Sequence, residues 1–174
     1  MQPLADEADA ILGYPVVGSD EDLSSLLRQT PQALVTVGQI RSPEIRIRLF
    51  ELLKQSGGKL PSIVSPSAYC SKYAEVDEGT IVMHGAIVNA GASIGANCII
   101  NSQTLIEHDV FVADHCHVST GARLNGGVTI GEGSFVGSGA ILKEGIVIGE
   151  NVIIGAGQVI LRDVPIGAVV KNDQ

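Results

Sequence analysis

The chain has 174 residues, of which 45% are apolar and only 3% aromatic, so we expect one domain with a small appendage around a core of Val, Ile, Leu and Ala. Its net charge of −8 argues against a nucleic-acid-binding protein, which needs a basic face, and disfavours docking on an anionic membrane surface. Residues 1–20 lack the basic start and apolar run of a signal peptide, and no stretch reaches the length of a membrane span, so a cytoplasmic protein without membrane insertion is expected.

The start of the chain shows signals for one strand, one helix and a second strand. Residues 14–18 have the character of a short strand and turn. Asp20 can cap a helix that continues to about Arg28, because its side chain can accept hydrogen bonds from the free N–H groups of the first turn. The apolar residues 33–38 predict a buried strand that ends at Gly38.

A second helix is predicted after this strand. Ser42 is a capping residue, Pro43 suits the first turn, and the helix should run to about Gln55 before the glycines at positions 57–58. Strand, helix, strand and helix suggest an α/β unit with too few parts for a complete doubly wound sheet. Residues 1–60 are therefore predicted to form a partial α/β unit.

From Val64 onwards, every sixth residue is a large aliphatic one. Eighteen positions from Val64 to Ile166 follow this step without a slip, and all but Cys70 are Val, Ile or Leu. Four residues after each of them stands a second, mostly small residue, such as Ala86 or Ala122. A helix cannot keep a period of six, because its apolar stripe repeats every 3.6 residues. The pattern is typical of a short strand followed by a sharp turn.

The repeat predicts a mainly β fold, a parallel β-helix of the hexapeptide-repeat type over residues 61–174. Three hexads close one triangular coil, so the eighteen hexads give about six coils, stacked about 4.8 Å apart. Cys70, Cys98 and Cys116 fall on inward-facing positions and lack metal-type spacing, which favours a role as small buried apolar residues.

One histidine stands between two carboxylates at a corner of a coil. His108 lies between Glu107 and Asp109, and Gly126, one coil later, stacks over it and is followed by Gly127. The glycines leave open space beside the imidazole. A carboxylate can fix the tautomer of such a histidine and stabilise its imidazolium, which suits a general base. A solvated corner histidine with acidic neighbours explains the same residues.

A second histidine lies half a coil away. His117 is nine residues from His108 and therefore projects from the middle of the face opposite that corner. The packed prism separates the two side chains, so one site that uses both must be built from two chains. Asn101 lies on the same face as His117. A packing role at an interface remains open for His117, and is favoured for His84 and His115.

Residues 100–109 and 117–122 resemble a family signature. The string Asn101…Glu107-His108-Asp109…His117-Val-Ser-Thr-Gly-Ala resembles the sugar O- and N-acetyltransferases, namely the sialic acid O-acetyltransferase family and the bacillosamine-type enzymes that acetylate UDP-4-amino-sugars. The resemblance covers about residues 10–170. It implies a left-handed β-helix, a homotrimer, acetyl-CoA as co-substrate and a sugar acceptor that is linked to a nucleotide.

The resemblance also implies catalytic roles. His108 would be the general base that deprotonates a sugar amine or hydroxyl as this group attacks the thioester of acetyl-CoA directly. Asp109, or with less support Glu107, would orient His108.

Binding roles follow from the same resemblance. His117 of the neighbouring chain would contact the acetyl or acceptor end, and Asn101 would help to position the acceptor. The CoA moiety would lie in the groove between two prisms, near Gly126, Gly127 and this His117. Family members begin with a strand and a Gly-rich turn that binds the nucleotide sugar. This chain carries the later Gly38, a candidate acceptor-binding residue, and the helix after it, but not that turn.

Three other interpretations of the sequence remain. An enzyme of the same fold could use another acceptor. A metal enzyme resembling the γ-type carbonic anhydrases could take histidines from two chains, but His108, His115 and His117 do not form a cluster within one chain, so we expect no metal centre. A trimeric scaffold without catalytic activity would keep the repeat, although the Glu-His-Asp sequence speaks against it.

Overall fold

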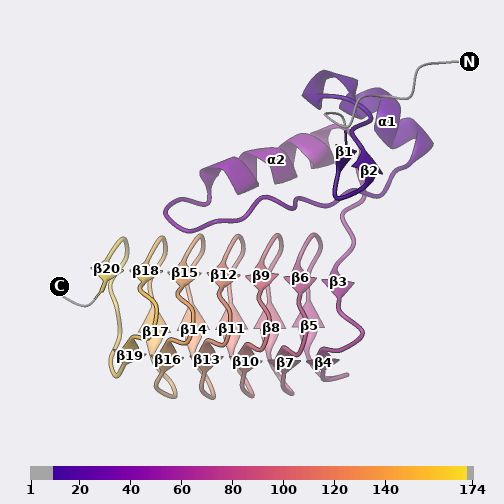
Figure 1. Cartoon of the computed structure of the whole chain (residues 1–174). Coiled ribbons are helices and arrows are strands. Elements are labelled where there is room, and N and C mark those ends of the chain that lie inside the picture. Colours follow the sequence, from indigo (N-terminus) through magenta and orange to yellow (C-terminus); the bar gives the residue numbers. More distant parts are fainter. Residues whose placement is uncertain (1–9, 172–174) are drawn as a thin grey trace, which may run out of the picture.

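The computed structural model describes residues 10–171, which form a triangular prism of stacked coils with a small unit laid along one face (Figure 1). Residues 1–9 of the predicted N-terminal unit and residues 172–174 of the predicted β-helix lie outside the described residues. The prism is a left-handed parallel β-helix of about six coils, as the repeat and the resemblance together predict. The division of the chain into two domains at residue 60 stays a prediction.

Eighteen strands of two residues each build the three faces of the prism. We name each face after one of its strands. The β12 face contains β3 (Ile63–Val64), β6 (Ile81–Val82), β9 (Ile99–Ile100), β12 (His117–Val118), β15 (Phe135–Val136), β18 (Ile153–Ile154) and β20 (Val169–Val170). The β10 face contains β4 (Tyr69–Cys70), β7 (Ile87–Val88), β10 (Leu105–Ile106), β13 (Arg123–Leu124), β16 (Ile141–Leu142) and β19 (Val159–Ile160). The β11 face contains β5 (Glu75–Val76), β8 (Ser93–Ile94), β11 (Phe111–Val112), β14 (Thr129–Ile130) and β17 (Val147–Ile148).

Neighbouring strands of a face pair in parallel with a register of eighteen residues, as Val88, Ile106 and Leu124 show. Successive residues of a strand point to opposite sides, so the second residue of each strand enters the prism. These three side chains are fully buried, which confirms the predicted inward column. Two-residue strands and tight turns therefore explain the period of six.

The prediction that the register continues unbroken to Ile166 is wrong. β20 pairs with β18 in a register of sixteen residues, and Val164 bridges β17 with the same offset. Ile166 is 71% exposed, while Val164 and Val170 pack against the core instead. The carboxylate of Asp163 accepts the backbone N–H of Val147 at 2.9 Å, so a side chain satisfies this edge of the shortened coil.

The N-terminal unit contains a hairpin and helices but not the second predicted strand. Its elements are β1 (Ala10–Ile11), β2 (Tyr14–Pro15), the 3₁₀ turn η2 (Asp20–Asp22), α1 (Leu23–Gln29) and α2 (Glu44–Gln55). Both predicted helices are present, but Asp20 and Ser42 do not occupy the predicted cap positions: Ser19 precedes the 3₁₀ turn, and Pro43 is the N-cap of α2. Residues 33–38 form no strand: a single bridge joins Gln32 to Lys59, and the segment otherwise runs extended without a partner strand. The prediction of a strand here is wrong, because an apolar run does not supply the neighbour that a strand requires.

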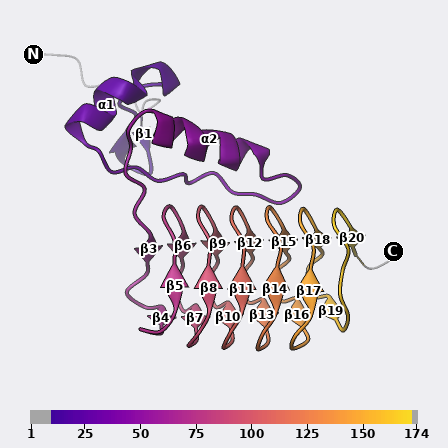
Figure 2. The ribbon, with the colours of Figure 1, turned by 180° about the vertical axis from the view of Figure 1, so that it is seen from behind.

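The N-terminal unit covers the β12 face, with α2 running along it (Figures 1 and 2). The guanidinium of Arg46 lies in this interface and is almost completely buried. It donates to the backbone oxygens of Val35 at 2.9 Å and Val37 at 2.8 Å within the unit, and to that of Asn97 in the β-helix at 3.2 Å. One side chain thus joins the extended segment, the helix and the prism.

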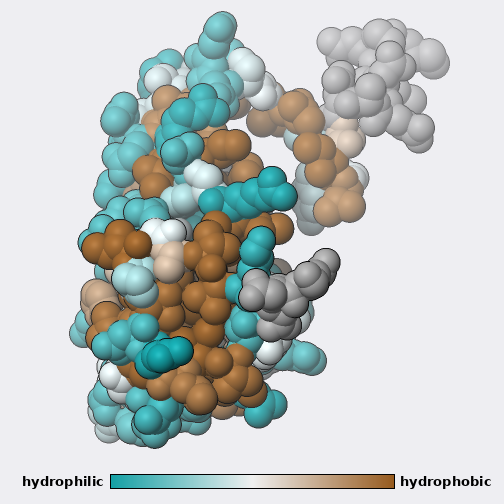
Figure 3. Space-filling model, turned by 90° about the vertical axis from the view of Figure 1, so that its left-hand side faces the viewer, coloured by the Kyte–Doolittle hydropathy of each residue, from teal (hydrophilic) through white to brown (hydrophobic). Residues whose placement is uncertain are grey.

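Apolar side chains also gather at the C-terminal end of the prism, where the last coil has no successor (Figure 3). Val159, Leu161, Ile166 and Val169 are all more than half exposed there. The two-residue slip contributes to this exposure, because it turns Ile166 away from the interior.

Replacing Arg46 with alanine should loosen the N-terminal unit while the β-helix stays folded. Each of the three backbone acceptors left without its donor in a buried interface costs about 1–3 kcal/mol. We expect limited proteolysis to cut Arg46→Ala within residues 30–60 much faster than the native chain. The matched control is Arg48→Ala, an exposed arginine on the same helix. Equal cleavage rates for the two variants would contradict this role for Arg46.

Candidate active site

His108 and Asp109 form the turn between β10 and β11, at the corner where the β10 and β11 faces meet. His108 Nδ1 lies 2.9 Å from Asp109 Oδ2, and about two thirds or more of each side chain is exposed, 67% and 73%. A carboxylate accepts hydrogen bonds, so Nδ1 carries the proton in the neutral ring. The other nitrogen, Nε2, then has a free lone pair that can accept a proton from a substrate.

The glycine one coil later gives the imidazole its space. A Cβ atom added at Gly126 would lie 2.6 Å from both Cε1 and Nε2 of His108, so only glycine allows the ring to lie in this place. Gly127 follows with φ +70°, and its N–H donates to the His108 oxygen at 2.9 Å. The stacking predicted from the eighteen-residue step is therefore present.

Glu107 is directed elsewhere. Its Oε2 accepts a hydrogen bond from Asn89 Nδ2 at 3.0 Å, from the coil below. Of the two carboxylates that flank His108, Asp109 is thus the one that contacts the ring, in agreement with the order of preference from the sequence.

His117 lies on β12, across the prism from His108, as predicted. Its ring does not project into solvent, however: it is 8% exposed and lies beneath the N-terminal unit. Nδ1 donates to the backbone oxygen of Gln39 at 2.7 Å, and Nε2 lies 3.3 Å from Asn101 Nδ2. Gly38 directly precedes Gln39. The structure therefore brings Asn101 and His117 together, with Gly38 next to the residue that His117 contacts, on a different side of the prism from His108 and Asp109.

The environment of His117 favours its neutral form. Burial lowers the pKa of His117, the charge of Arg46 lowers it further, and the hydrogen bond to the Gln39 carbonyl opposes them. Because a carbonyl can only accept, Nδ1 is the donor and Nε2 can accept from Asn101. The neutral ring thereby links the extended segment of the N-terminal unit to the β12 face.

His115, Cys98 and Cys116 are buried in structural surroundings. His115 is buried, hydrogen-bonds Asn97 at 2.9 Å and packs edge-on against Phe50 of α2. Cys98 and Cys116 are buried free thiols stacked one coil apart. Within residues 10–171, no three His, Cys, Asp or Glu side chains lie close enough together to hold a metal ion.

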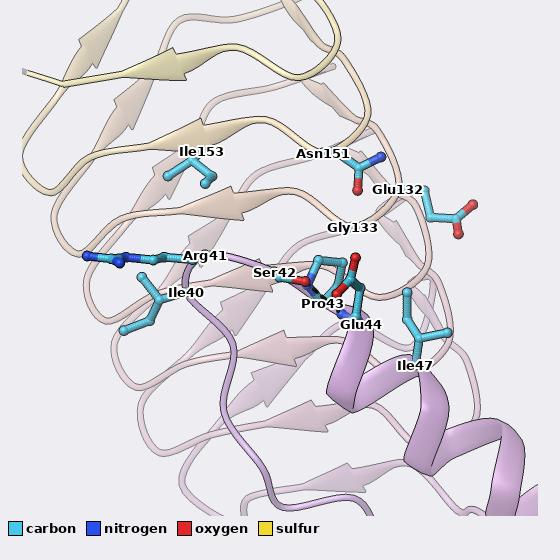
Figure 4. Close-up of a pocket in the computed structure, with 10 residues that line it drawn as sticks. All are labelled: Ile40, Arg41, Ser42, Pro43, Glu44, Ile47, Glu132, Gly133, Asn151 and Ile153. Atoms are coloured by element: carbon cyan, nitrogen blue, oxygen red, sulfur yellow. Dashed lines mark hydrogen bonds between the residues drawn. The ribbon is translucent and has the colours of Figure 1, made fainter.

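A cavity of about 470 Å³ opens between the start of α2 and the β-helix (Figure 4). Arg41, Ser42 and Glu44 stand on one side, and Glu132 and Asn151 stand on the turns opposite. The full lining is Ile40, Arg41, Ser42, Pro43, Glu44, Ile47, Glu132, Gly133, Asn151 and Ile153. Among residues 10–171, Arg41 has no ion-pair partner.

The cavity is joined to His117 through a residue that the sequence did not single out. Gln39 Nε2 donates to the backbone oxygen of Gly133, which lines the cavity, at 3.1 Å, while the backbone oxygen of Gln39 accepts from His117. Sequence reasoning also missed Arg41 and Asn89. The eighteen-residue step could have placed Asn89 beneath Glu107, but no periodic signal exists for the segment that carries Gln39 and Arg41.

Comparisons with known proteins place the chain in a family. The family described as Bacterial transferase hexapeptide (six repeats) matches residues 127–162. The acetyltransferase domain of PglB from Neisseria gonorrhoeae FA1090, in complex with acetyl coenzyme A, is 34% identical with TM-score 0.87, over 92% of this chain and 77% of that one. PerB from Caulobacter crescentus, a perosamine N-acetyltransferase in complex with CoA and GDP-perosamine, is 35% identical with TM-score 0.87, over 94% and 78%. The chain belongs to the hexapeptide-repeat sugar N-acetyltransferases.

Two further comparisons add little to this assignment. WeeI from Acinetobacter baumannii AYE, at 24% identity and TM-score 0.83, over 94% of this chain and 77% of that one, shows the same fold. No curated protein sequence matches the chain. As a member of this family the chain is an acyltransferase, and the family resemblance noted from residues 100–122 is confirmed. None of the helices within residues 10–171 is long and apolar enough to cross a membrane.

The sugar N-acetyltransferase should lose stability at mildly acidic pH through His117. Its pKa is lowered in the folded protein, so below about pH 6.5, the ordinary histidine value, the unfolded chain binds a proton more readily than the folded one. Stability should therefore fall as the pH drops from 7.5 to 5.5. In His117→Gln, whose amide can still donate to Gln39, melting temperatures should fall less over this range. An equal fall in both proteins would refute the assignment.

Proposed function

We propose that the chain transfers the acetyl group of acetyl-CoA to an amino group of a nucleotide-linked sugar, with His108 as general base. The observation that carries this proposal is the His108–Asp109 pair, whose imidazole lies in the space left by Gly126 and whose Nε2 has a free lone pair. Family membership supports the reaction class, because the related structures hold acetyl coenzyme A, CoA and GDP-perosamine. Acetyl-CoA is the co-substrate of this reaction, which we place in the cytoplasm.

The pair can carry the proton of the reaction. The sugar nitrogen attacks the carbonyl carbon of the thioester and passes a proton to His108 Nε2 as the C–N bond forms. The C–S bond then breaks, and the imidazolium can return the proton to the departing thiolate. Asp109 keeps Nδ1 protonated and stabilises the charged ring. A positioned base of this kind contributes about 10²–10⁴-fold, and holding the two substrates together supplies much of the remainder.

The cavity at the start of α2 fits the nucleotide part of the acceptor. The guanidinium of Arg41 can pair with phosphate oxygens in a bidentate manner, while Ile40, Ile47 and Ile153 supply apolar surface. Asn101 and His117 lie on the same face, and His117 holds the segment of Gly38 and Gln39 that leads into one wall of the cavity. In this proposal His117 acts on the acceptor site by positioning Gln39, since its own ring is covered.

The two parts of the proposed site lie on opposite sides of one prism, so we propose a homotrimer in which neighbouring subunits complete each other. His108 of one subunit would face the β12 side of the next, with the CoA moiety between them near Gly126 and Gly127. Large apolar side chains on the faces that flank the His108 corner support this arrangement. The exposed ones are Tyr69, Ile87, Ile141 and Val159 on the β10 face and Phe111 and Val147 on the β11 face.

The first test is thiol release from acetyl-CoA in the presence of GDP-perosamine and a panel of UDP-4-amino-sugars. We expect turnover with at least one acceptor and a loss of about 10²–10⁴-fold in kcat for His108→Ala, since no other group at the corner can replace Nε2. His84→Ala, which removes another exposed histidine, should keep native activity. Native turnover in His108→Ala would exclude this histidine as the base.

Sharing of the site between subunits predicts complementation. His108→Ala and Arg41→Ala should each be nearly inactive as pure proteins. Co-expressed and purified as mixed trimers, they should regain a substantial fraction of native activity, because some contacts between subunits then combine an intact His108 with an intact Arg41. Sedimentation should show a trimer for every sample. A monomer with full activity, or mixed trimers without recovered activity, would contradict the shared site.

A further inference from the structure

The coil below the catalytic turn contains a second turn that lies directly beneath it. Asn89, Ala90 and Gly91 connect β7 to β8, which pair with β10 and β11. The backbone N–H of Asp109 donates to the oxygen of Ala90 at 3.2 Å. Asn89 thus lies under Glu107, and Gly91 lies under Asp109.

Gly91 makes room for the carboxylate that contacts His108. A Cβ atom added at Gly91 would overlap Asp109 Oδ1, so the carboxylate rests against the bare Cα of the glycine. In that place the other oxygen, Oδ2, lies 2.9 Å from His108 Nδ1. Gly91 has φ +76° and Asp109 has φ +59°, so both turns share the left-handed conformation and stack closely.

Asn89 has the complementary effect on the other carboxylate. Its Nδ2 donates to Glu107 Oε2 at 3.0 Å, in a partly buried contact that holds Glu107 down along the prism. The turns below and above the catalytic turn, at residues 89–91 and 125–127, carry no charged side chain. Within these three turns, the charged side chains beside His108 are therefore those of Glu107 and Asp109.

We infer that Asn89 and Gly91 are positioning residues that assign Asp109, and not Glu107, to His108. The expected effect of these residues on catalysis rests on the proposed function. Their effect on the position of the two carboxylates does not. Gly91 leaves room for the Asp109 carboxylate beside Nδ1, and Asn89 holds the Glu107 carboxylate away from Nδ1. Together they fix the tautomer in which Nε2 is the free base.

The test for Gly91 is its replacement by alanine. The methyl group displaces the Asp109 carboxylate, so kcat should fall about tenfold to a hundredfold while KM for both substrates stays near native. Gly85→Ala is the matched control: Gly85 has φ +67° at the same place in its turn, and its Cβ would meet only Gln103 Cγ at an ordinary 3.6 Å. It should keep native activity. Added to Asp109→Ala, Gly91→Ala should cause no further loss, because the carboxylate that it displaces is already absent.

A spectroscopic measurement separates this inference from the proposed function. The ¹⁵N spectrum of the His108 imidazole, assigned with His108→Ala, should show the Nδ1–H tautomer in the native protein and in Gly85→Ala. Gly91→Ala should show a mixture of both neutral tautomers. If no acceptor is turned over but the tautomers change in this way, the positioning role stands and the proposed function fails. If the tautomer is unchanged in folded Gly91→Ala, the positioning role is refuted.

Asn89 is tested by rescue. In Asp109→Asn, Glu107 is the remaining carboxylate beside His108 but is held by Asn89. Adding Asn89→Ala releases it, so the double variant should recover several-fold of the kcat lost in Asp109→Asn, and a further Glu107→Gln should remove the recovery. A double variant no more active than Asp109→Asn would overturn the role given to Asn89.

Discussion

Parallel backbone pairing at a step of eighteen residues is the constraint on which the rest of this molecule depends. Each residue of a coil lies over the residue one coil earlier, and its backbone groups bond to that neighbour. A functional side chain is therefore never placed alone. What lies above and below His108 is fixed by the register, and here it is Gly126 and Ala90. In such a stack the small residues shape the site as much as the reactive ones do, because a single Cβ would take the space that a ring or carboxylate needs.

The N-terminal unit packs on one of the three faces of the prism, so the covered face and the two open faces are suited to different roles. Its contact with the β12 face contains buried polar side chains that pair across it, among them Gln39, Arg46, Asn97 and His117. Breaking hydrogen bonds between buried polar groups costs free energy, so these bonds favour the observed arrangement of the unit on the prism. The β10 and β11 faces keep exposed apolar side chains at the strand positions. The covered face is thus suited to holding a binding segment, and the open faces are suited to contact with other subunits.

The sequence was sufficient to predict the prism, because one aliphatic residue every six positions leaves no other regular structure. It also placed Gly126 over His108, since stacking follows from arithmetic once the period is known. The prediction failed at Ile166, where the hexad pattern continues but the pairing slips by two residues. The pattern records which residues are apolar, whereas the pairing depends on which backbone groups find partners. At this edge the carboxylate of Asp163 accepts a backbone N–H in place of a backbone oxygen, and the hexad pattern gives no sign of this hydrogen bond.

Outside the repeat, the sequence predicted the elements that local signals define, but not the structure that depends on contacts between distant residues. The helix α2 was found because Ser42, Pro43 and the glycines after Gln55 are local signals for its ends. The strand expected at residues 33–38 was not found, because the segment's partners are the guanidinium of Arg46 and the ring of His117 and not another strand. These contacts join residues that are 9 to 78 positions apart and follow no period. The acceptor side of the proposed site is built from such contacts, while the catalytic side is built from the repeat. This explains why the sequence indicates a candidate base more readily than the sugar of the proposed reaction.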